Sequence, residues 1–163
     1  MPTAQQVAEA VRDAMWAGDR ASRMLGMQML AIGPGLSRMS MTVREDMLNS
    51  HAICHGGLIT TLADSAFAFA CNAYNEFTVA SGFDVNLVAS AKLGDVLTAS
   101  ARELTRTRRT AVYDIDVHNQ DGRRIAAFRG RSTTLVGKPV VPGLRSTRDE
   151  PTAQAGRPPE RTP

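Results

Sequence analysis

One stretch of this chain, residues 58–71, consists almost entirely of apolar or small residues and contains no proline, glycine or basic residue. A helix that is apolar on every side lies in a protein interior, and this stretch is too short to span a membrane. A single carboxylate, Asp64, stands in the middle of it. Burying a charge is costly unless something compensates for it. The stretch therefore predicts a buried central helix that carries a functional acid.

Two glycines, Gly56 and Gly57, stand directly before this stretch. A helix N-terminus carries unpaired N–H donors and the positive end of the helix dipole, and glycines leave those donors uncovered. Such a terminus suits an anion or a developing oxyanion. A tight turn before the helix is the alternative interpretation of the same pair.

The composition is that of one globular domain, with 43% hydrophobic and 21% charged residues in 163. A net charge of +3 and few aromatic residues give no indication of a nucleic-acid partner. The only cysteines, Cys54 and Cys71, are typical of reduced, buried thiols. Acidic residues near the N-terminus, without a long apolar run, predict a cytoplasmic protein with no membrane partner.

Apolar positions recur at helical spacing over residues 4–17, with Thr3 as the expected N-cap and Gly18 as the end. The central helix is expected to stop near Tyr74. Alternation and turn signals predict strands at residues 24–32, 35–43, 77–88, 96–104, 110–118 and 124–136. Strands joined by short turns favour an antiparallel sheet. We therefore predict an α+β fold in which a curved antiparallel sheet wraps around one long central helix.

Composition divides the chain into three parts. An N-terminal amphipathic helix falls within residues 1–20, and the sheet with its central helix falls within 21–137. Residues 138–163 hold six of the eight prolines and no large apolar cluster. Segments of this composition cannot bury enough apolar surface to fold. We therefore expect a disordered tail from Lys138 onward.

Several motifs follow one another across residues 21–136. They are Met47-Leu48-Asn49, Cys54-His55-Gly56-Gly57, Leu62-Ala63-Asp64, Ala66-Phe67-Ala68, Gly94-Asp95-Val96 and Phe128-Arg129-Gly130. With these motifs the chain resembles the hotdog-fold acyl-CoA thioesterases of the phenylacetate-degradation (PaaI) type. The combination of HGG with an acid seven residues later is more specific than HGG alone. The resemblance implies a hotdog fold assembled into dimers and tetramers.

The resemblance also implies a reaction, the hydrolysis of a small aromatic acyl-CoA such as phenylacetyl-CoA or hydroxyphenylacetyl-CoA. Asp64 would be the nucleophile or general base, and the Gly56 N–H would bind the thioester carbonyl. Asn49 would help to place the water or the carbonyl, and His55 completes the candidate catalytic set. CoA is part of the substrate, so no cofactor is expected. The family often carries an Arg-Pro pair at the end of the strand that follows the helix, where this chain has Val88-Ala89-Ser90.

Other interpretations of these residues are possible but disfavoured. A structural ion pair for Asp64 is disfavoured because no Lys or Arg lies within one helical turn. His51, Cys54 and His55 could indicate thiol catalysis or a metal site, but adjacent side chains rarely face one another and no fourth ligand is near. We therefore expect no metal, a packed thiol and a histidine that supports the loop through a hydrogen bond.

A basic set consists of Arg106, Arg108, Arg109 and Lys92. Guanidinium groups beside threonines would suit the phosphates of CoA, so these residues are the candidate CoA-binding set. A solvated turn is the alternative for the three arginines, and both interpretations stay open.

The spacing of Asp64 and Gly56 predicts an active site shared between two chains. Eight residues along a helix correspond to roughly 12 Å, whereas both groups must lie within about 3 Å of the reacting atoms. Two antiparallel helices related by a two-fold axis would bring one chain's acid to the other's glycine.

Two rivals to the thioesterase are a hotdog hydratase or dehydratase and a non-catalytic acyl-CoA-binding protein.

Overall fold

Six antiparallel strands form one curved sheet, as predicted, and the structure shows their order in it to be β1-β2-β4-β5-β6-β3. The computed structural model describes residues 1–152. The strands are β1 (Gln28–Gly33), β2 (Leu36–Thr42), β3 (Thr78–Leu87), β4 (Val96–Arg106), β5 (Thr110–His118) and β6 (Arg124–Thr134). The helices are α1 (Ala4–Gly18), α2 (Arg20–Met24), the 3-10 turn η1 (Glu45–Met47) and α3 (Gly56–Asn72).

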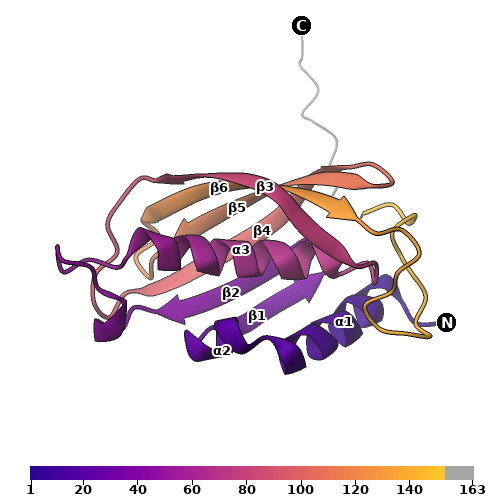
Figure 1. Cartoon of the computed structure of the whole chain (residues 1–163), viewed down its shortest axis with the longest axis horizontal. Helices are drawn as coiled ribbons and strands as arrows, with labels where there is room; N and C mark the ends of the chain where they lie inside the picture. The colour runs from indigo at the N-terminus through magenta and orange to yellow at the C-terminus, as the bar shows by residue number, and fades with distance from the viewer. Residues whose placement is uncertain (153–163) are drawn as a thin grey trace, which may run out of the picture.

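The central helix α3 lies across one face of the sheet (Figure 1). Alternation along β5 turns Tyr113, Ile115 and Val117 toward α3, and all three are fully buried. Gly130 of β6 allows the helix to approach, because a β-carbon there would lie 2.8 Å from the ring of Phe67. The predicted wrapping of the sheet around the helix is confirmed, and α3 begins at Gly56, two residues earlier than the apolar stretch.

The N-terminal helix α1 packs beside the sheet through Val7 and Val11. Its N-cap is Thr3, as predicted, and the Thr3 and Gln6 side chains cap each other's backbone N–H groups. The first strand begins later than predicted, at Gln28 rather than residue 24. Residues 20–24 form α2 instead, because the Asp19 carboxylate caps it by accepting from the Ser22 N–H at 2.9 Å.

The disorder predicted from Lys138 onward is wrong for residues 138–150, here called the strap. The buried Asn75 side chain binds the strap backbone at Val141 and Leu144, and the Thr147 N–H donates to the Tyr74 carbonyl at 3.0 Å. Hydrogen bonds from polar side chains and from the backbone hold this segment in place. Its low apolar content was therefore a misleading sign of disorder. The predicted disorder of 153–163 lies outside the described residues.

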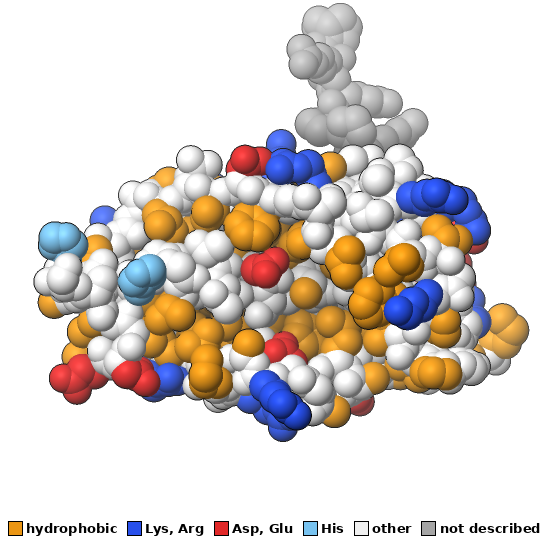
Figure 2. Space-filling view, in the orientation of Figure 1, with side chains coloured by type: hydrophobic (Ala, Val, Ile, Leu, Met, Phe, Trp, Pro, Cys, Tyr) orange, Lys and Arg blue, Asp and Glu red, His pale blue; other side chains and the backbone are white. Residues whose placement is uncertain are grey.

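Within the described residues, no helix is both long enough and apolar enough to cross a membrane. Figure 2 shows that hydrophobic side chains gather on the face that carries α3, with basic and acidic groups mainly toward its rim.

Candidate active site

The N-terminus of α3 is organised by His55, which is its N-cap. Nδ1 of His55 accepts a hydrogen bond from the Gly57 N–H at 3.0 Å, so the loop-supporting role predicted for this histidine is confirmed. The neighbouring Gly56 N–H has no acceptor among residues 1–152. It is therefore an uncommitted donor at the positive end of the helix dipole.

Asn49 lies beside this helix start. Its Oδ1 accepts a hydrogen bond from the backbone N–H of His51 at 2.9 Å, and the backbone N–H of Asn49 donates to the Ile53 carbonyl at 2.8 Å. The side-chain amide nitrogen donates to no group in the described part of the chain. Asn49 and Gly56 line the same cavity of about 350 Å³, beside Leu87 at the end of β3. The structure thus brings two predicted site residues together.

Asp64 is half-buried in the middle of α3. Within residues 1–152 its carboxylate makes neither a hydrogen bond nor an ion pair; the nearby Ser65 hydroxyl pairs with Ser22 instead. Burial raises the pKa of Asp64 above its ordinary value. A carboxylate that is exposed enough to react, yet unpaired and partly desolvated, is typical of a functional acid.

A second cavity, of about 330 Å³, opens beside Asp64. Its walls are largely apolar and come from four separate parts of the chain: α1, α3, the start of β3 and the strap. The residues that line it include Met15, Phe67, Phe77, Val79 and Val140. Sequence reasoning did not identify these wall residues as part of a site, because each is an ordinary apolar residue; Phe67 stands within the motif Ala66-Phe67-Ala68, but nothing in that motif indicates a cavity.

Asp64 and Gly56 line different cavities of the same chain. The acid's cavity lies at the start of β3, where Thr78, Val79 and Ala80 line it. The glycine's cavity lies at the other end of β3, beside Leu87 and the residues that follow. One chain alone therefore does not assemble the acid and the oxyanion donor around a single substrate atom.

The basic set is dispersed. Arg106 is largely buried, donates to Glu103 at 3.2 Å and to the carbonyls of Arg148 and Glu150, and stacks on the Tyr74 ring. It is thus committed to contacts within the fold.

The other members of the set are more accessible. Arg108 lies 3.7 Å from Asp149, and Arg109 lines a surface cavity together with Lys138. Lys92 is exposed, and the carbonyl of its neighbour Ala91 accepts from the Cys54 N–H at 2.9 Å. Lys92 therefore lies on the side of the molecule that carries the Gly56 cavity. CoA binding by the basic set stays a prediction.

The two thiols are poor nucleophiles. Burial raises the pKa of the Cys54 thiol, and it raises the pKa of Cys71 to about 12. A thiol reacts as its thiolate, which these values disfavour near neutral pH. Thiol catalysis is therefore disfavoured.

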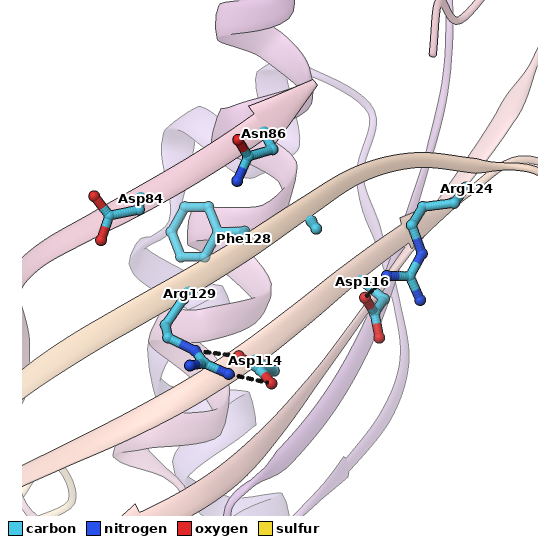
Figure 3. A pocket seen from close by; sticks show the side chains of 8 residues that line it. Asp84, Asn86, Asp114, Asp116, Arg124, Phe128 and Arg129 are labelled. Atoms are coloured by element: carbon cyan, nitrogen blue, oxygen red, sulfur yellow. Dashed lines mark hydrogen bonds and ion pairs between the residues drawn. The ribbon is translucent and has the colours of Figure 1, made fainter. Parts of the chain in front are cut away.

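A third cavity, of about 350 Å³, lies on the outer face of the sheet over β3, β5 and β6 (Figure 3). Its charges are paired: Arg129 donates twice to Asp114, at 2.7 and 2.9 Å, and Arg124 lies 3.2 Å from Asp116. These side chains alternate with the buried residues of β5, so the cavity is on the face opposite α3. Exposed pairs of this kind are solvated surface features, and we do not assign the reaction to them.

The sequence and the fold are similar to those of known proteins. Residues 51–126 match the model of the thioesterase superfamily. The acyl-coenzyme A thioesterase PaaI of Escherichia coli K12 is 39% identical over 124 residues, which cover 76% of this chain and 89% of that protein. The solved structure of the E. coli PaaI protein from the phenylacetic acid degradation operon superimposes with a TM-score of 0.82 at 36% identity, covering 83% of this chain and 99% of that one.

A more distant solved structure contains a ligand. The Streptococcus mutans protein smu.793, bound to acetyl CoA, has a TM-score of 0.64 at 27% identity, over 66% of this chain and 87% of that one. Together with the fold and the position of Asp64 on α3, these similarities show that the chain belongs to the thioesterase superfamily and is a hotdog-fold acyl-CoA thioesterase of the PaaI type.

Proposed function

We propose that this thioesterase acts on small acyl-CoAs whose acyl group is aromatic, such as phenylacetyl-CoA and hydroxyphenylacetyl-CoA. The observation that carries the proposal is the cavity beside Asp64, whose walls include Phe67 and Phe77. An apolar cavity of about 150 Å³ binds benzene, and this one measures about 330 Å³. A phenyl ring would therefore fit with its thioester held near the carboxylate.

The proposed chemistry needs two groups. Asp64 either attacks the thioester carbonyl directly or takes a proton from an attacking water. The Gly56 N–H donates to the oxyanion that forms, and the C–S bond then breaks, with the CoA sulfur taking up a proton as CoA leaves. If water has attacked, this step yields the free acid. If Asp64 has attacked, it leaves an anhydride between Asp64 and the acyl group, which a water then hydrolyses to give the free acid and restore the carboxylate. Asn49 holds the water or the carbonyl through its uncommitted amide, while His55 fixes the helix start. Thioester hydrolysis involves no oxidation or reduction, so we propose that the enzyme uses no cofactor besides the CoA of its substrate.

We further propose that two chains share each site by pairing their β3 strands. No described strand covers the outer edge of β3, and Val79, Phe83 and Leu87 along it are 44%, 40% and 51% exposed. An uncovered edge with apolar side chains is a template for another strand. Antiparallel pairing about a two-fold axis would set the start of one β3 beside the end of the other. The Asp64 cavity of each chain would then meet the Gly56 cavity of its partner.

The same pairing supports a location for the CoA phosphates. Arg109 and Lys138 lie near the start of β3, since the Arg109 carbonyl accepts from Thr134 and the Lys138 carbonyl from Phe77. Lys92 follows the end of β3. In an antiparallel pair these basic groups come from the two chains and flank one shared site. We extend the proposal to a tetramer of two such dimers. We also propose a cytoplasmic location, because the reducing cytoplasm keeps unpaired cysteines as free thiols.

Release of free thiol from a panel of acyl-CoAs tests the proposed function. We expect higher kcat/KM for phenylacetyl-CoA and hydroxyphenylacetyl-CoA than for acetyl-CoA or palmitoyl-CoA. Asp64→Asn should lower kcat by a factor of about 10² to 10⁴, because it keeps the shape and removes the base. Asp13→Asn, on the exposed side of α1, is the matched control and should keep full activity.

Three outcomes would contradict all or part of the proposal. Conversion of an enoyl-CoA or a hydroxyacyl-CoA without thiol release would indicate a hydratase or dehydratase. Binding of acyl-CoA without any turnover would indicate a binding protein. A preference for acetyl-CoA or palmitoyl-CoA would leave the thioesterase intact and reject only the aromatic substrate class.

A further inference from the structure

We propose that the strap sets the size of the acyl group this enzyme accepts, with Val140 as the distal wall of the Asp64 cavity. Val140 lines that cavity together with Phe77 and Met15, although it lies in a proline-rich segment far along the chain. The inference rests on the proposed function, in which the cavity holds the acyl group. It assigns substrate selection to a residue outside the hotdog sheet and its central helix.

The backbone on both sides of Val140 is fixed. On one side, the Phe77 N–H donates to the Lys138 carbonyl at 2.8 Å. On the other side, the Val141 N–H donates to Oδ1 of Asn75 at 2.8 Å, and the Asn75 amide donates back to the Val141 carbonyl at 3.2 Å. Val140 therefore lies in a short span held at both ends.

The burial and the backbone conformation of Asn75 fix its side chain in position for this contact. It is 1% exposed and adopts a left-handed backbone conformation, with φ of 61°, which asparagine tolerates better than most residues. Its amide also donates to the Leu144 carbonyl at 2.8 Å. A buried amide that lost these partners would pay a desolvation penalty, so the strap and Asn75 hold each other in place.

A second anchor lies further along the strap. The Arg148 side chain is only 4% exposed and donates to the carbonyls of Arg108 and Thr107, at 3.0 and 3.1 Å. The strap is thus tied to the β4–β5 turn as well as to the residues after α3. An apolar side chain on a segment held at this many points is a fixed wall rather than a mobile lid.

A fixed wall selects by size. One methylene more or less in an apolar pocket changes kcat/KM by roughly tenfold or more. Val140 carries no charge, so its replacement should alter the acyl preference without altering the chemistry of a substrate too short to reach it. Acetyl-CoA is such a substrate, and its kcat/KM serves as the internal reference.

The test uses the full-length enzyme with acetyl-CoA, phenylacetyl-CoA and 4-phenylbutyryl-CoA. Val140→Ala should raise the ratio of kcat/KM for phenylbutyryl-CoA over acetyl-CoA by about tenfold. Val140→Phe should lower the ratio for phenylacetyl-CoA over acetyl-CoA by a similar factor. Val141→Ala is the matched control, since the adjacent valine contacts Asn75 through its backbone and does not line the cavity. Its ratios should equal those of the wild type.

A second variant tests the anchor. Asn75→Gly permits the left-handed backbone and removes the whole side chain, including the amide that holds the strap, so it should relax the acyl preference in the same direction as Val140→Ala. Wild-type ratios in both Val140 variants, in an enzyme that still depends on Asp64, would overturn the proposal and leave the proposed function standing. If the wild type released no thiol, or released it just as fast after Asp64→Asn, the proposed function would be overturned instead, and this inference with it.

Discussion

The side chain of Leu87, at the end of β3, occupies the space that a β-carbon on Gly56 would need. The first residue of α3 and the last residue of β3 are therefore packed as one unit. The absent side chain at position 56 leaves the helix N–H open to the cavity that Asn49 also lines. Glycine at this position follows from packing as well as from its place in the HGG motif.

Gly56→Ala should lower kcat/KM by a factor of up to about 10², because the new methyl needs the space of the half-exposed Leu87 side chain, and whatever part of the clash Leu87 does not relieve by moving displaces the N–H donor. Adding Leu87→Ala should recover much of that loss. Gly57→Ala is the comparison, since its β-carbon would lie 3.0 Å from His55 Nδ1 and so disturb the cap instead. If Leu87→Ala rescued both glycine variants equally, the contact would not be the cause.

Asp64 should cost stability at neutral pH. Burial raises its pKa in the folded state, so the folded chain holds the proton more tightly than the unfolded chain does. Stability therefore falls as pH rises through the window between the unfolded and the folded pKa. Asp64→Asn should raise Tm near pH 7, and this gain should vanish below about pH 4. Thermal unfolding of both proteins across this pH range is the measurement; an equal gain at both ends would rule out the charge as its origin.

The shared site predicts complementation between two inactive chains. Asp64→Asn chains and Gly56→Val chains, mixed and allowed to exchange subunits, should form heterodimers in which one site of two has an intact acid and an intact donor. Each purified heterodimer should show about half of the wild-type kcat per dimer. Inactive heterodimers, from parents that both fold and dimerise, would refute the sharing of sites.

Substitution of Arg106 and of Arg109 should have different effects, because the two side chains make different contacts. Arg106→Ala removes the cation beside the nearly buried Glu103, which also accepts from the hydroxyls of Tyr74 and Tyr113. Breaking a buried pair costs about 3 kcal/mol or more, so Tm should fall markedly.

Arg109→Ala should instead leave Tm near the wild-type value, raise KM for acyl-CoA and weaken the dependence of KM on salt. A short thioester that lacks the nucleotide should be hydrolysed as before. An unchanged KM for acyl-CoA would return Arg109 to a solvated surface role.

Much of this molecule could be predicted from local patterns. The apolar stretch around Asp64 identified the central helix, and its spacing from Gly56 indicated that one chain cannot bring the two groups together. Thr3 marked the start of α1, and alternation with short turns indicated the six strands and their antiparallel direction, although not their order in the sheet. These features are local, because periodicity, caps and turns depend on neighbouring residues and survive in the sequence as regular spacing.

Tertiary structure alone decided the rest. The walls of the Asp64 cavity come from four separate segments, and Val140 belongs to one that composition marked as disordered. Arg106 became part of the folded interior because Glu103 and the strap surround it. The strap is ordered because Asn75 and Arg148 supply hydrogen bonds across long stretches of chain. Such contacts leave no periodic trace in the sequence, since they depend on which distant backbone groups the fold brings within reach of a polar side chain.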